Sequence, residues 1–172
     1  MNDFEKIYAL YGNQVYKYLV SLTRDSMLAE ELTQETFYQA IKSIHRFKGE
    51  CKLSVWLCQI AKYSFYKYKR KHKQEEKELE QLSSIMMEYE SPESISESNE
   101  SSQSIKAAMS RLKDPYGEVV RLRTYGDLSF REIGDAMGYS ENWARITFYR
   151  GKLKLKEILI QQERRNGNGD KL

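Results

Sequence analysis

The sequence has few of the residues that usually bind metals. Among its 172 residues there are two cysteines and two histidines. Cys51 and Cys58 lie seven positions apart, and His45 and His72 are scattered, whereas a structural zinc site usually takes four nitrogen or sulfur ligands from closely spaced pairs. We therefore expect no metal site, and we expect both cysteines to be free thiols in a reducing compartment.

Long apolar runs are missing too. No segment approaches the roughly 20 apolar residues that a membrane-spanning helix needs. The first residues, MNDFEKIYALYG, do not join a positively charged region to an apolar one, as a secretory signal does. We expect a cytoplasmic protein that does not insert into a membrane.

Catalytic motifs and strand patterns are also absent. The sequence has no glycine-rich phosphate loop, and no nucleophile stands with a base in a recognisable motif. We therefore expect neither an enzyme nor a bound cofactor. No stretch alternates apolar and polar residues between hairpin turns, so we expect no sheet.

The charge is unevenly distributed along the chain. From His72 to Ser104, nine acidic and two basic residues give a net charge of −7, although the whole chain carries +3. Two basic regions therefore flank an acidic middle that is rich in Ser and Glu. Such asymmetry often marks a polyanionic partner.

The acidic middle divides the chain. We expect an N-terminal domain at 1–73, an acidic linker at 74–104, a C-terminal domain at 105–162 and a disordered tail at 163–172. Gln74 to Met87 could extend a helix, but Glu88 to Gln103 has little to bury. The predicted fold is all-α, with two small helical domains joined by a flexible linker.

Apolar residues of the N-terminal domain recur at spacings of three and four, which is typical of helices with one buried face. A first helix would turn inward Phe4, Ile7, Tyr8, Tyr11, Val15, Tyr18, Leu19 and Leu22. A second helix, from about Met27 to Ile44, would bury Leu28, Leu32, Phe37, Ala40, Ile41 and Ile44. After a loop around Gly49, Ser54 is a plausible N-cap for a third helix that continues to His72.

The C-terminal domain carries the signals of a helix-turn-helix. Ser129 and Glu132 have the spacing of a capping box, and Gly138 can end that helix in a left-handed conformation. Ser140 can cap a last helix that runs to about Gln162. Gly134 offers no side chain where the two helices would cross.

The last helix has an apolar side and a basic side. Ala144 and Phe148 can bury it against the preceding helix, which turns Phe130, Ile133 and Met137 inward. Trp143 could pack or reach DNA, and packing is favoured. The opposite face would read duplex DNA, where arginine can bind guanine with two hydrogen bonds and lysine meets phosphates; its candidates are Asn142, Arg145, Ile146, Tyr149, Arg150 and Lys152. The alternative is a solvated basic face on an ordinary helical hairpin.

A second basic stretch lies in the N-terminal domain. Residues 62–73, KYSFYKYKRKHK, contain six Lys or Arg residues, no acid and four interleaved aromatic residues. Positively charged side chains along the phosphate backbone, together with aromatic rings that stack on the bases, can bind single-stranded nucleic acid. The alternative is that some rings belong to the core and that the lysines favour the negative end of the helix dipole. Arg46, Lys48 and Lys52 in the preceding loop would face a phosphate backbone.

One acidic patch contrasts with this basic domain. In AEELTQETF, Leu32 and Phe37 point inward, so Glu31, Gln34 and Glu35 lie on an outer polar face. A solvated helix surface is the ordinary explanation. A protein partner with a basic helix is the alternative.

In this order, these segments resemble the bacterial RNA polymerase sigma factors of the extracytoplasmic-function (ECF) group. RDSMLAEELTQETFYQAIKSIHRFKGECKLSVWLCQIAK resembles region 2 of the sigma-70 family, and LKDPYGEVVRLRTYGDLSFREIGDAMGYSENWARITFYRGKLKLKE resembles region 4. The resemblance implies a factor that binds core RNA polymerase and directs initiation at promoters through −10 and −35 elements. It also implies a cognate anti-sigma factor as a partner.

The resemblance assigns roles by position. Glu31, Gln34 and Glu35 align with the residues that dock on the β′ coiled coil of the polymerase, and the region 4 domain rests on the β flap. The last helix aligns with the −35 reader. The −10 surface comprises Arg46, Lys48, Lys52, Lys62, Tyr63, Tyr66, Lys67 and Arg70.

Two positions depart from the family pattern. Tyr63 stands where an asparagine is common, and Lys67 stands where an acid is often found. The chain would then prefer a different −10 base or hold single strands by stacking and charge.

Two other classes of protein compete with this interpretation. A stand-alone helix-turn-helix regulator would not need to dock on core polymerase, but it leaves the acidic patch and the aromatic-basic helix without a role. An RNA-binding or anti-termination protein would use mainly residues 62–73.

Overall fold

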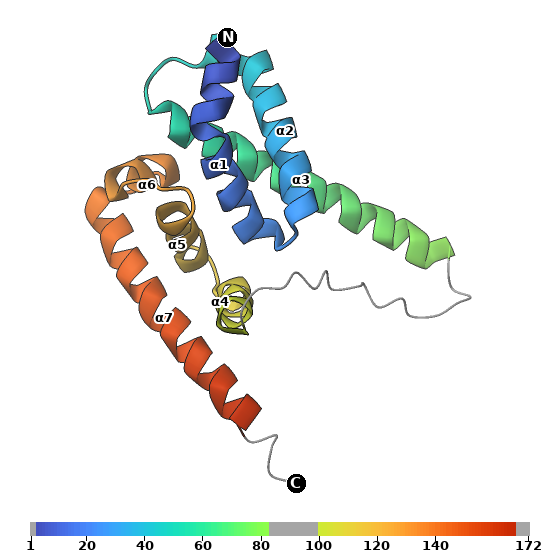
Figure 1. The fold of residues 1–172 in the computed structure, drawn as a ribbon, viewed down its shortest axis with the longest axis vertical. Coiled ribbons are helices and arrows are strands. Elements are labelled where there is room, and N and C mark those ends of the chain that lie inside the picture. Colours follow the sequence, from blue (N-terminus) through green and yellow to red (C-terminus); the bar gives the residue numbers. More distant parts are fainter. Residues whose placement is uncertain (1–2, 83–99, 168–172) are drawn as a thin grey trace.

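The computed structural model describes the backbone of residues 3–82 and 100–167 and the side chains of 3–74 and 103–165 (Figure 1). These residues form helices and connecting turns, and no strand occurs among them. The predicted all-α fold is confirmed.

Three helices form the N-terminal lobe: α1 (Asp3–Thr23), α2 (Ser26–Ser43) and α3 (Leu53–Leu82), with a short 3-10 helix, η1 (Ile44–Arg46), after α2. Asp25 separates α1 from α2. Its carboxylate accepts hydrogen bonds from the backbone N–H groups of Met27 and Leu28, which satisfies donors at the start of α2. The three helices pack against one another in pairs.

The predicted inward faces are mostly confirmed. Val15, Tyr18 and Leu19 of α1 are buried, and so are Leu32, Phe37 and Ala40 of α2. Three of the predictions are wrong, because Tyr8, Ile41 and Ile44 are 42%, 47% and 45% exposed. Ile41 and Ile44 lie near the end of α2, which is partly uncovered there.

The predicted start of the third helix is wrong. Ser54 lies inside α3, because the helix begins at Leu53. The carbonyl of Lys52 accepts the backbone N–H of Trp56 at 3.2 Å, so the chain enters the helix two residues before the position expected for a cap at Ser54. The helix also continues past His72 to Leu82.

Four helices form the C-terminal lobe: α4 (Glu100–Arg111), α5 (Tyr116–Thr124), α6 (Phe130–Met137) and α7 (Glu141–Gly167). Two predicted limits are wrong. The first five residues of α4, 100–104, were expected in a linker, and α7 passes Gln162. The remaining predicted linker residues 83–99 and tail residues 168–172 lie outside the described part of the chain.

The turn between α6 and α7 has the geometry that its sequence predicts. Ser129 and Glu132 form both hydrogen bonds of a capping box, and Gly138 ends α6 with φ of 76°. A Cβ at Gly134 would lie 2.8 Å from backbone atoms of Tyr139 and Ser140. Glycine therefore allows the two helices to meet this closely.

The two lobes pack directly on each other (Figure 1). Val15 and Leu57 of the N-terminal lobe belong to the same buried cluster as Val119, Leu128 and Ile133 of the C-terminal lobe. The sequence predicted two bodies joined by a linker and did not predict this common core. Amphipathic periodicity shows that a face is buried but does not identify what covers it.

Candidate nucleic-acid interface

The acidic patch of α2 lies on the side of the helix away from the core. Glu31 and Gln34 are exposed and Glu35 is half-buried, whereas Leu32 and Phe37 are buried. The periodicity of the helix therefore presents the three polar side chains together. Oε1 of Glu35 accepts a 2.8 Å hydrogen bond from Nε2 of Gln39, one turn later.

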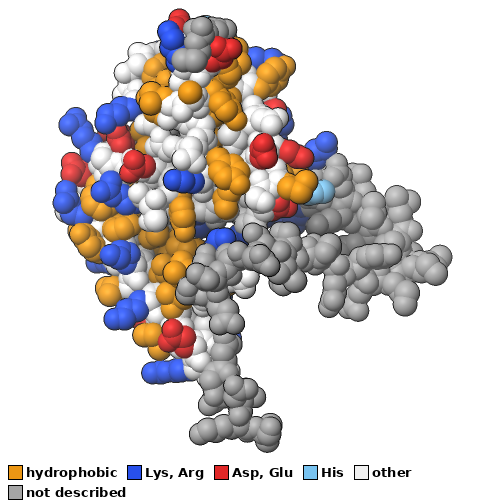
Figure 2. Space-filling model, viewed as in Figure 1, with side chains coloured by type: hydrophobic (Ala, Val, Ile, Leu, Met, Phe, Trp, Pro, Cys, Tyr) orange, Lys and Arg blue, Asp and Glu red, His pale blue; other side chains and the backbone are white. Residues whose placement is uncertain are grey.

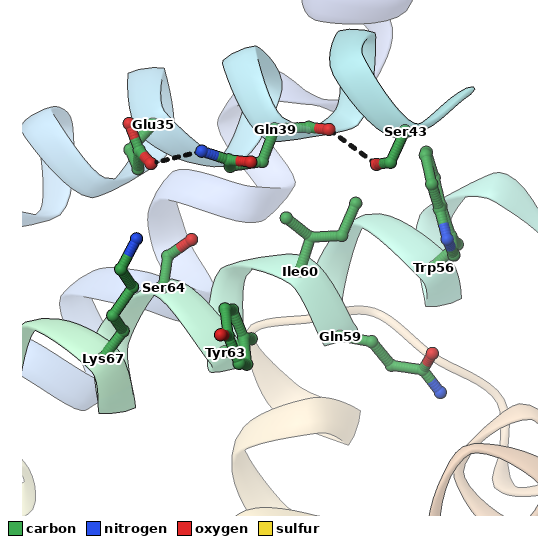
Figure 3. Close-up of a pocket in the computed structure, with 9 residues that line it drawn as sticks. All are labelled: Glu35, Gln39, Ser43, Trp56, Gln59, Ile60, Tyr63, Ser64 and Lys67. Atoms are coloured by element: carbon green, nitrogen blue, oxygen red, sulfur yellow. Dashed lines mark hydrogen bonds between the residues drawn. The ribbon is translucent and has the colours of Figure 1, made fainter. Parts of the chain in front are cut away.

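Beside this patch, a groove of about 400 Å³ runs between α2 and α3 (Figure 3). Tyr63 and Lys67, predicted at the −10 surface, therefore lie in the same groove as Glu35, predicted to dock on polymerase. The groove is lined from α2 by Glu35, Gln39 and Ser43, and from α3 by Trp56, Gln59, Ile60, Tyr63, Ser64 and Lys67.

The sequence interpretation missed most of this lining, although a signal was present. Trp56, Ile60, Tyr63 and Lys67 are spaced by four, three and four residues, so they lie on one side of a helix. On α2, Gln39 and Ser43 continue the same register from Glu35. The helical spacing of each set of residues could have been recognised in the sequence. Only the packing of α2 on α3 shows that the two sets face each other.

The groove combines the chemistry that unpaired bases need. The Tyr63 ring is 62% exposed and can stack on a base. Trp56 is braced by Phe47, with ring centroids 5.1 Å apart, while Gln39 and Gln59 offer amide donors and acceptors. Lys67 adds a cation at the end of the groove (Figure 3).

The other predicted −10 residues divide into two groups. Arg46, Lys48, Tyr66 and Arg70 are exposed on the N-terminal lobe. Lys52 and Lys62 instead bind the C-terminal lobe: Nζ of Lys52 lies 2.7 Å from Oε1 of Glu132, and Nζ of Lys62 lies 3.1 Å from Oε1 of Glu118. The structure therefore brings two predicted DNA contacts to the junction between the lobes.

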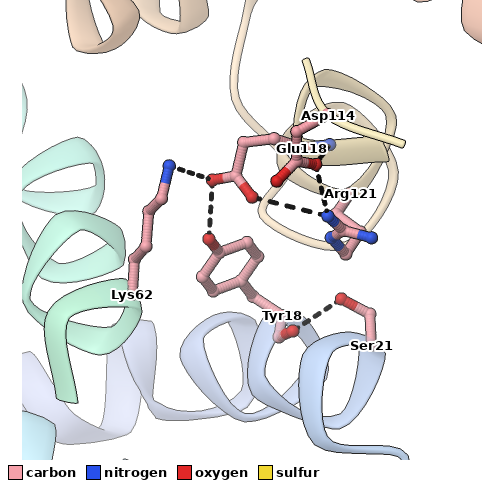
Figure 4. Close-up of polar contacts among 6 residues, drawn as sticks. All are labelled: Tyr18, Ser21, Lys62, Asp114, Glu118 and Arg121. Carbon is pink, nitrogen blue, oxygen red and sulfur yellow. Dashed lines mark hydrogen bonds and ion pairs between the residues drawn. The ribbon is translucent and has the colours of Figure 1, made fainter. Parts of the chain in front are cut away.

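Glu118 is the centre of this junction (Figure 4). Its side chain is 1% exposed, and it accepts a 2.9 Å hydrogen bond from the hydroxyl of Tyr18. Arg121 lies 3.8 Å from its other oxygen and is held by Asp114 at 2.9 Å. Burial, followed by the Glu118 charge, raises the pKa of Tyr18 well above its ordinary value, so the phenol remains a donor.

The sequence interpretation assigned no role to Glu118 or Arg121. The available signal was two opposite charges three residues apart within the otherwise apolar run of PYGEVVRL. Charged residues are rarely buried without partners, so such a pair within an apolar helix predicts a polar contact inside the protein.

The last helix presents its predicted reading face to solvent. Ala144 is buried, and a Cβ at Gly151 would lie 2.8 Å from a methyl group of Val120. Because α7 packs closely on the side of Ala144 and Gly151, its opposite side faces solvent. All the predicted −35 residues are exposed: Asn142, Arg145, Ile146, Tyr149, Arg150 and Lys152. Basic side chains interspersed with hydrophobic ones follow this edge of the molecule (Figure 2).

Two details position this face. Nη2 of Arg145 lies 2.7 Å from Oε1 of Glu141, and its guanidinium lies 5.3 Å from the Phe130 ring centroid. Trp143 stacks on Tyr139 at 4.0 Å with an interplanar angle of 16°. Trp143 is also half-buried and packs against the common apolar core, so the packing role favoured for it is confirmed.

Comparison with known proteins identifies the family. Residues 7–75 match sigma-70 region 2. Over 154 residues the chain is 33% identical to the ECF RNA polymerase sigma factor SigM of Bacillus subtilis, covering 90% of this chain and 93% of SigM. The chain belongs to the ECF RNA polymerase sigma factors.

A second relative and a solved structure agree with this membership. The sigma factor is 28% identical to the RNA polymerase sigma factor YlaC of Bacillus subtilis over 162 residues, with 93% and 94% of the two chains covered. Its fold is similar to that of the sigma factor RpoE of Bartonella quintana, solved with the anti-sigma factor NepR. The TM-score is 0.69 at 21% identity, and 92% and 98% of the chains are covered.

Membership makes the chain a non-enzymatic factor for the initiation of transcription. Among the described residues of this sigma factor, no group of three His, Cys, Asp or Glu side chains could hold a metal ion. Within the same residues, no helix has both the length and the apolar character that a bilayer span requires.

Proposed function

We propose that this sigma factor distributes its tasks over three surfaces. Glu31, Gln34 and Glu35 dock on the β′ coiled coil of core RNA polymerase. The −10 element binds the groove and the basic face of α3. The exposed face of α7 reads the −35 element, and the C-terminal lobe rests on the β flap.

The observation that carries this proposal is the composition of the groove between α2 and α3. An exposed tyrosine, a tryptophan, two amides and a lysine line it, which suits unpaired bases that stack and form hydrogen bonds. The reading face of α7 is different, because it combines arginine and asparagine on a helix that can enter a major groove. Single-stranded and duplex recognition therefore belong to different lobes.

The domain division follows the same assignment. Helices α1 to α3 form the region 2 unit, and helices α4 to α7 form the region 4 unit. We place the factor in the cytoplasm, where polymerase and promoter DNA meet, and we propose a cognate anti-sigma factor as a partner. The Bartonella RpoE structure, solved with NepR, supports such a partner.

The test is transcription by purified core polymerase and this factor, with start sites sequenced from genomic fragments. The −10 and −35 positions of one strong promoter are then varied separately. Tyr63→Ala is expected to alter discrimination only among −10 variants, because the exposed ring is lost from the groove. Tyr149→Ala is expected to alter discrimination only among −35 variants, and the same profile for both substitutions would contradict the division.

A further inference from the structure

The outer face of α7 contains hydrophobic side chains as well as cations. The large hydrophobic side chains that α7 exposes, Ile146, Tyr149, Leu153 and Ile160, are 42%, 56%, 63% and 37% exposed. Their spacings of three, four and seven residues place them along one line of the helix, on the side away from the buried Ala144. A single exposed hydrophobic side chain is ordinary, whereas a line of them on one helix indicates an interaction surface.

Cations lie on both sides of this line. The ammonium of Lys152 lies 5.7 Å from the centroid of the Phe148 ring, and the ammonium of Lys154 lies 5.2 Å from that of the Tyr116 ring. Because the two lysines are two residues apart, about 200° of helical rotation separates them. A helix that enters a major groove with one lysine toward each phosphate backbone presents the line between them to the base edges.

Ile146 belongs to the part of α7 that enters such a groove first. It is the sixth residue of the helix, which begins at Glu141, and the N-terminal residues of a recognition helix contact base edges. Ile146 also lines a groove of about 350 Å³ with Asn142, one turn before it, and Arg150, one turn after it. An amide, a hydrocarbon and a guanidinium therefore follow one another, at steps of roughly two base pairs along DNA.

These three side chains differ in what they can recognise. Asparagine binds N6 and N7 of adenine, and arginine binds O6 and N7 of guanine. The side chain of Ile146 has neither a donor nor an acceptor. Of the four bases, only thymine presents an apolar group in the major groove, its 5-methyl group. At another base edge, Ile146 would cover a donor or an acceptor and leave it without a hydrogen bond.

We propose that Ile146 is a specificity-determining residue of the −35 reader, which packs against the 5-methyl group of one thymine. The inference rests on the proposed binding of the −35 element by α7 and adds the identity of one base to it. Because a Cβ at Gly151 would lie 2.8 Å from Val120, α7 is held closely on α5, and the position of Ile146 is fixed before DNA binds. Burial of one methyl group corresponds to about a fourfold change in affinity.

The first experiment removes the methyl group from DNA. Holoenzyme made from core polymerase and this sigma factor selects the preferred −35 element from a randomised library. Each thymine of that element, on either strand, is then replaced singly by deoxyuridine, which lacks only the methyl group. One replacement is expected to weaken holoenzyme binding about fourfold, as measured by competition with the unmodified promoter. Thymines in the spacer are the control, and their replacement is expected to leave the affinity unchanged.

The converse experiment restores the methyl group on another base. At the sensitive position, a promoter with cytosine is compared with one that carries 5-methylcytosine, whose methyl group occupies the same side of the major groove. The methylated promoter is expected to bind about fourfold more tightly than the unmethylated one. Equal affinities would overturn the methyl contact.

The third experiment assigns the contact to Ile146. Holoenzyme with Ile146→Ala is expected to bind the thymine and deoxyuridine promoters equally. Leu153→Ala, which removes an aliphatic side chain from the same line, is the matched control and is expected to keep the fourfold difference at that position. Circular dichroism checks that each variant folds. The proposal is overturned if folded Ile146→Ala keeps the difference, if no thymine methyl group affects the parent, or if the preferred element contains no thymine.

Failure of this inference differs from failure of the −35 assignment. If the randomised library yields no preferred −35 element, the proposed role of α7 fails and the inference fails with it. If a preferred element emerges and Tyr149→Ala changes it, but no thymine methyl group depends on Ile146, only the inference fails.

Discussion

The hydroxyl of Tyr18 in α1 donates a 2.9 Å hydrogen bond to Oε1 of Glu118 in α5, a hundred residues later in the chain. Tyr18 is fully buried, and Glu118 is 1% exposed. The bond therefore stabilises both the buried carboxylate and the junction of the two lobes.

Tyr18→Phe is expected to lower the free energy of unfolding by about 1–3 kcal/mol, since it leaves the carboxylate with one donor fewer. Urea unfolding followed by circular dichroism measures the change. Tyr8→Phe is the matched control on the same helix, where the side chain is 42% exposed. An identical midpoint for Tyr18→Phe and the parent chain would show that the bond does not stabilise the fold.

Glu35→Lys is expected to weaken binding to core polymerase by about tenfold, because it places a positive charge against a basic partner helix. The fold should survive, since Glu35 is half-buried and bonds only to Gln39 among the contacts described. Fluorescence anisotropy with labelled sigma factor measures the affinity. Glu157→Lys, at an exposed position of α7, makes the same change in net charge. An equal loss of polymerase affinity in that variant would show that the effect comes from overall charge and not from the position of Glu35.

Arg145→Ala is expected to reduce recognition of −35 sequences by roughly 1–3 kcal/mol at one base pair. Glu141 holds the guanidinium at 2.7 Å, so the arginine is oriented before it meets DNA. Transcription from promoters with single −35 substitutions measures the loss. Arg164→Ala, in the last turns of α7, is the control, and equal losses on −10 variants would refute the role at −35.

Gly134→Ala is expected to destabilise the C-terminal lobe by about 1–3 kcal/mol, because its Cβ would lie 2.8 Å from backbone atoms of the turn. Gly12→Ala is the control, since the atoms nearest to its Cβ would be those of the Tyr8 ring, at an ordinary contact distance of 3.4 Å or more. Alanine is the better helix former, so Gly12→Ala should leave stability unchanged or increase it. Thermal unfolding compares the two; equal midpoints would mean that α6 and α7 can move apart without cost.

The two thiols are expected to react at very different rates. Burial raises the pKa of Cys58 to about 12, and the side chain is 1% exposed, so almost no thiolate is accessible at neutral pH. Cys51 is partly exposed and its pKa is also raised, by burial and by Glu50. Iodoacetamide should therefore label Cys51 slowly, faster as pH rises, and Cys58 only after unfolding; rapid native labelling of Cys58 would contradict its burial.

Local structure was largely predictable because its causes are local. The capping box of Ser129 and Glu132 and the left-handed Gly138 depend on residues within one helical turn, and both appear as their spacing indicates. The outward face of α7 follows from the same reasoning, since Ala144 lies opposite it. The cap predicted at Ser54 does not form, because α3 already begins at Leu53.

The sequence by itself therefore determined the helices, the polar and apolar faces, and the family. Only the tertiary structure decided what each face meets. The sequence predicts Lys62 as a cation available to DNA, yet in the structure it forms an ion pair with Glu118. Glu35 and Lys67, which were assigned to different partners, line the same groove. The physical reason is that periodicity encodes the direction of a side chain along its own helix, whereas a contact also depends on how distant helices pack.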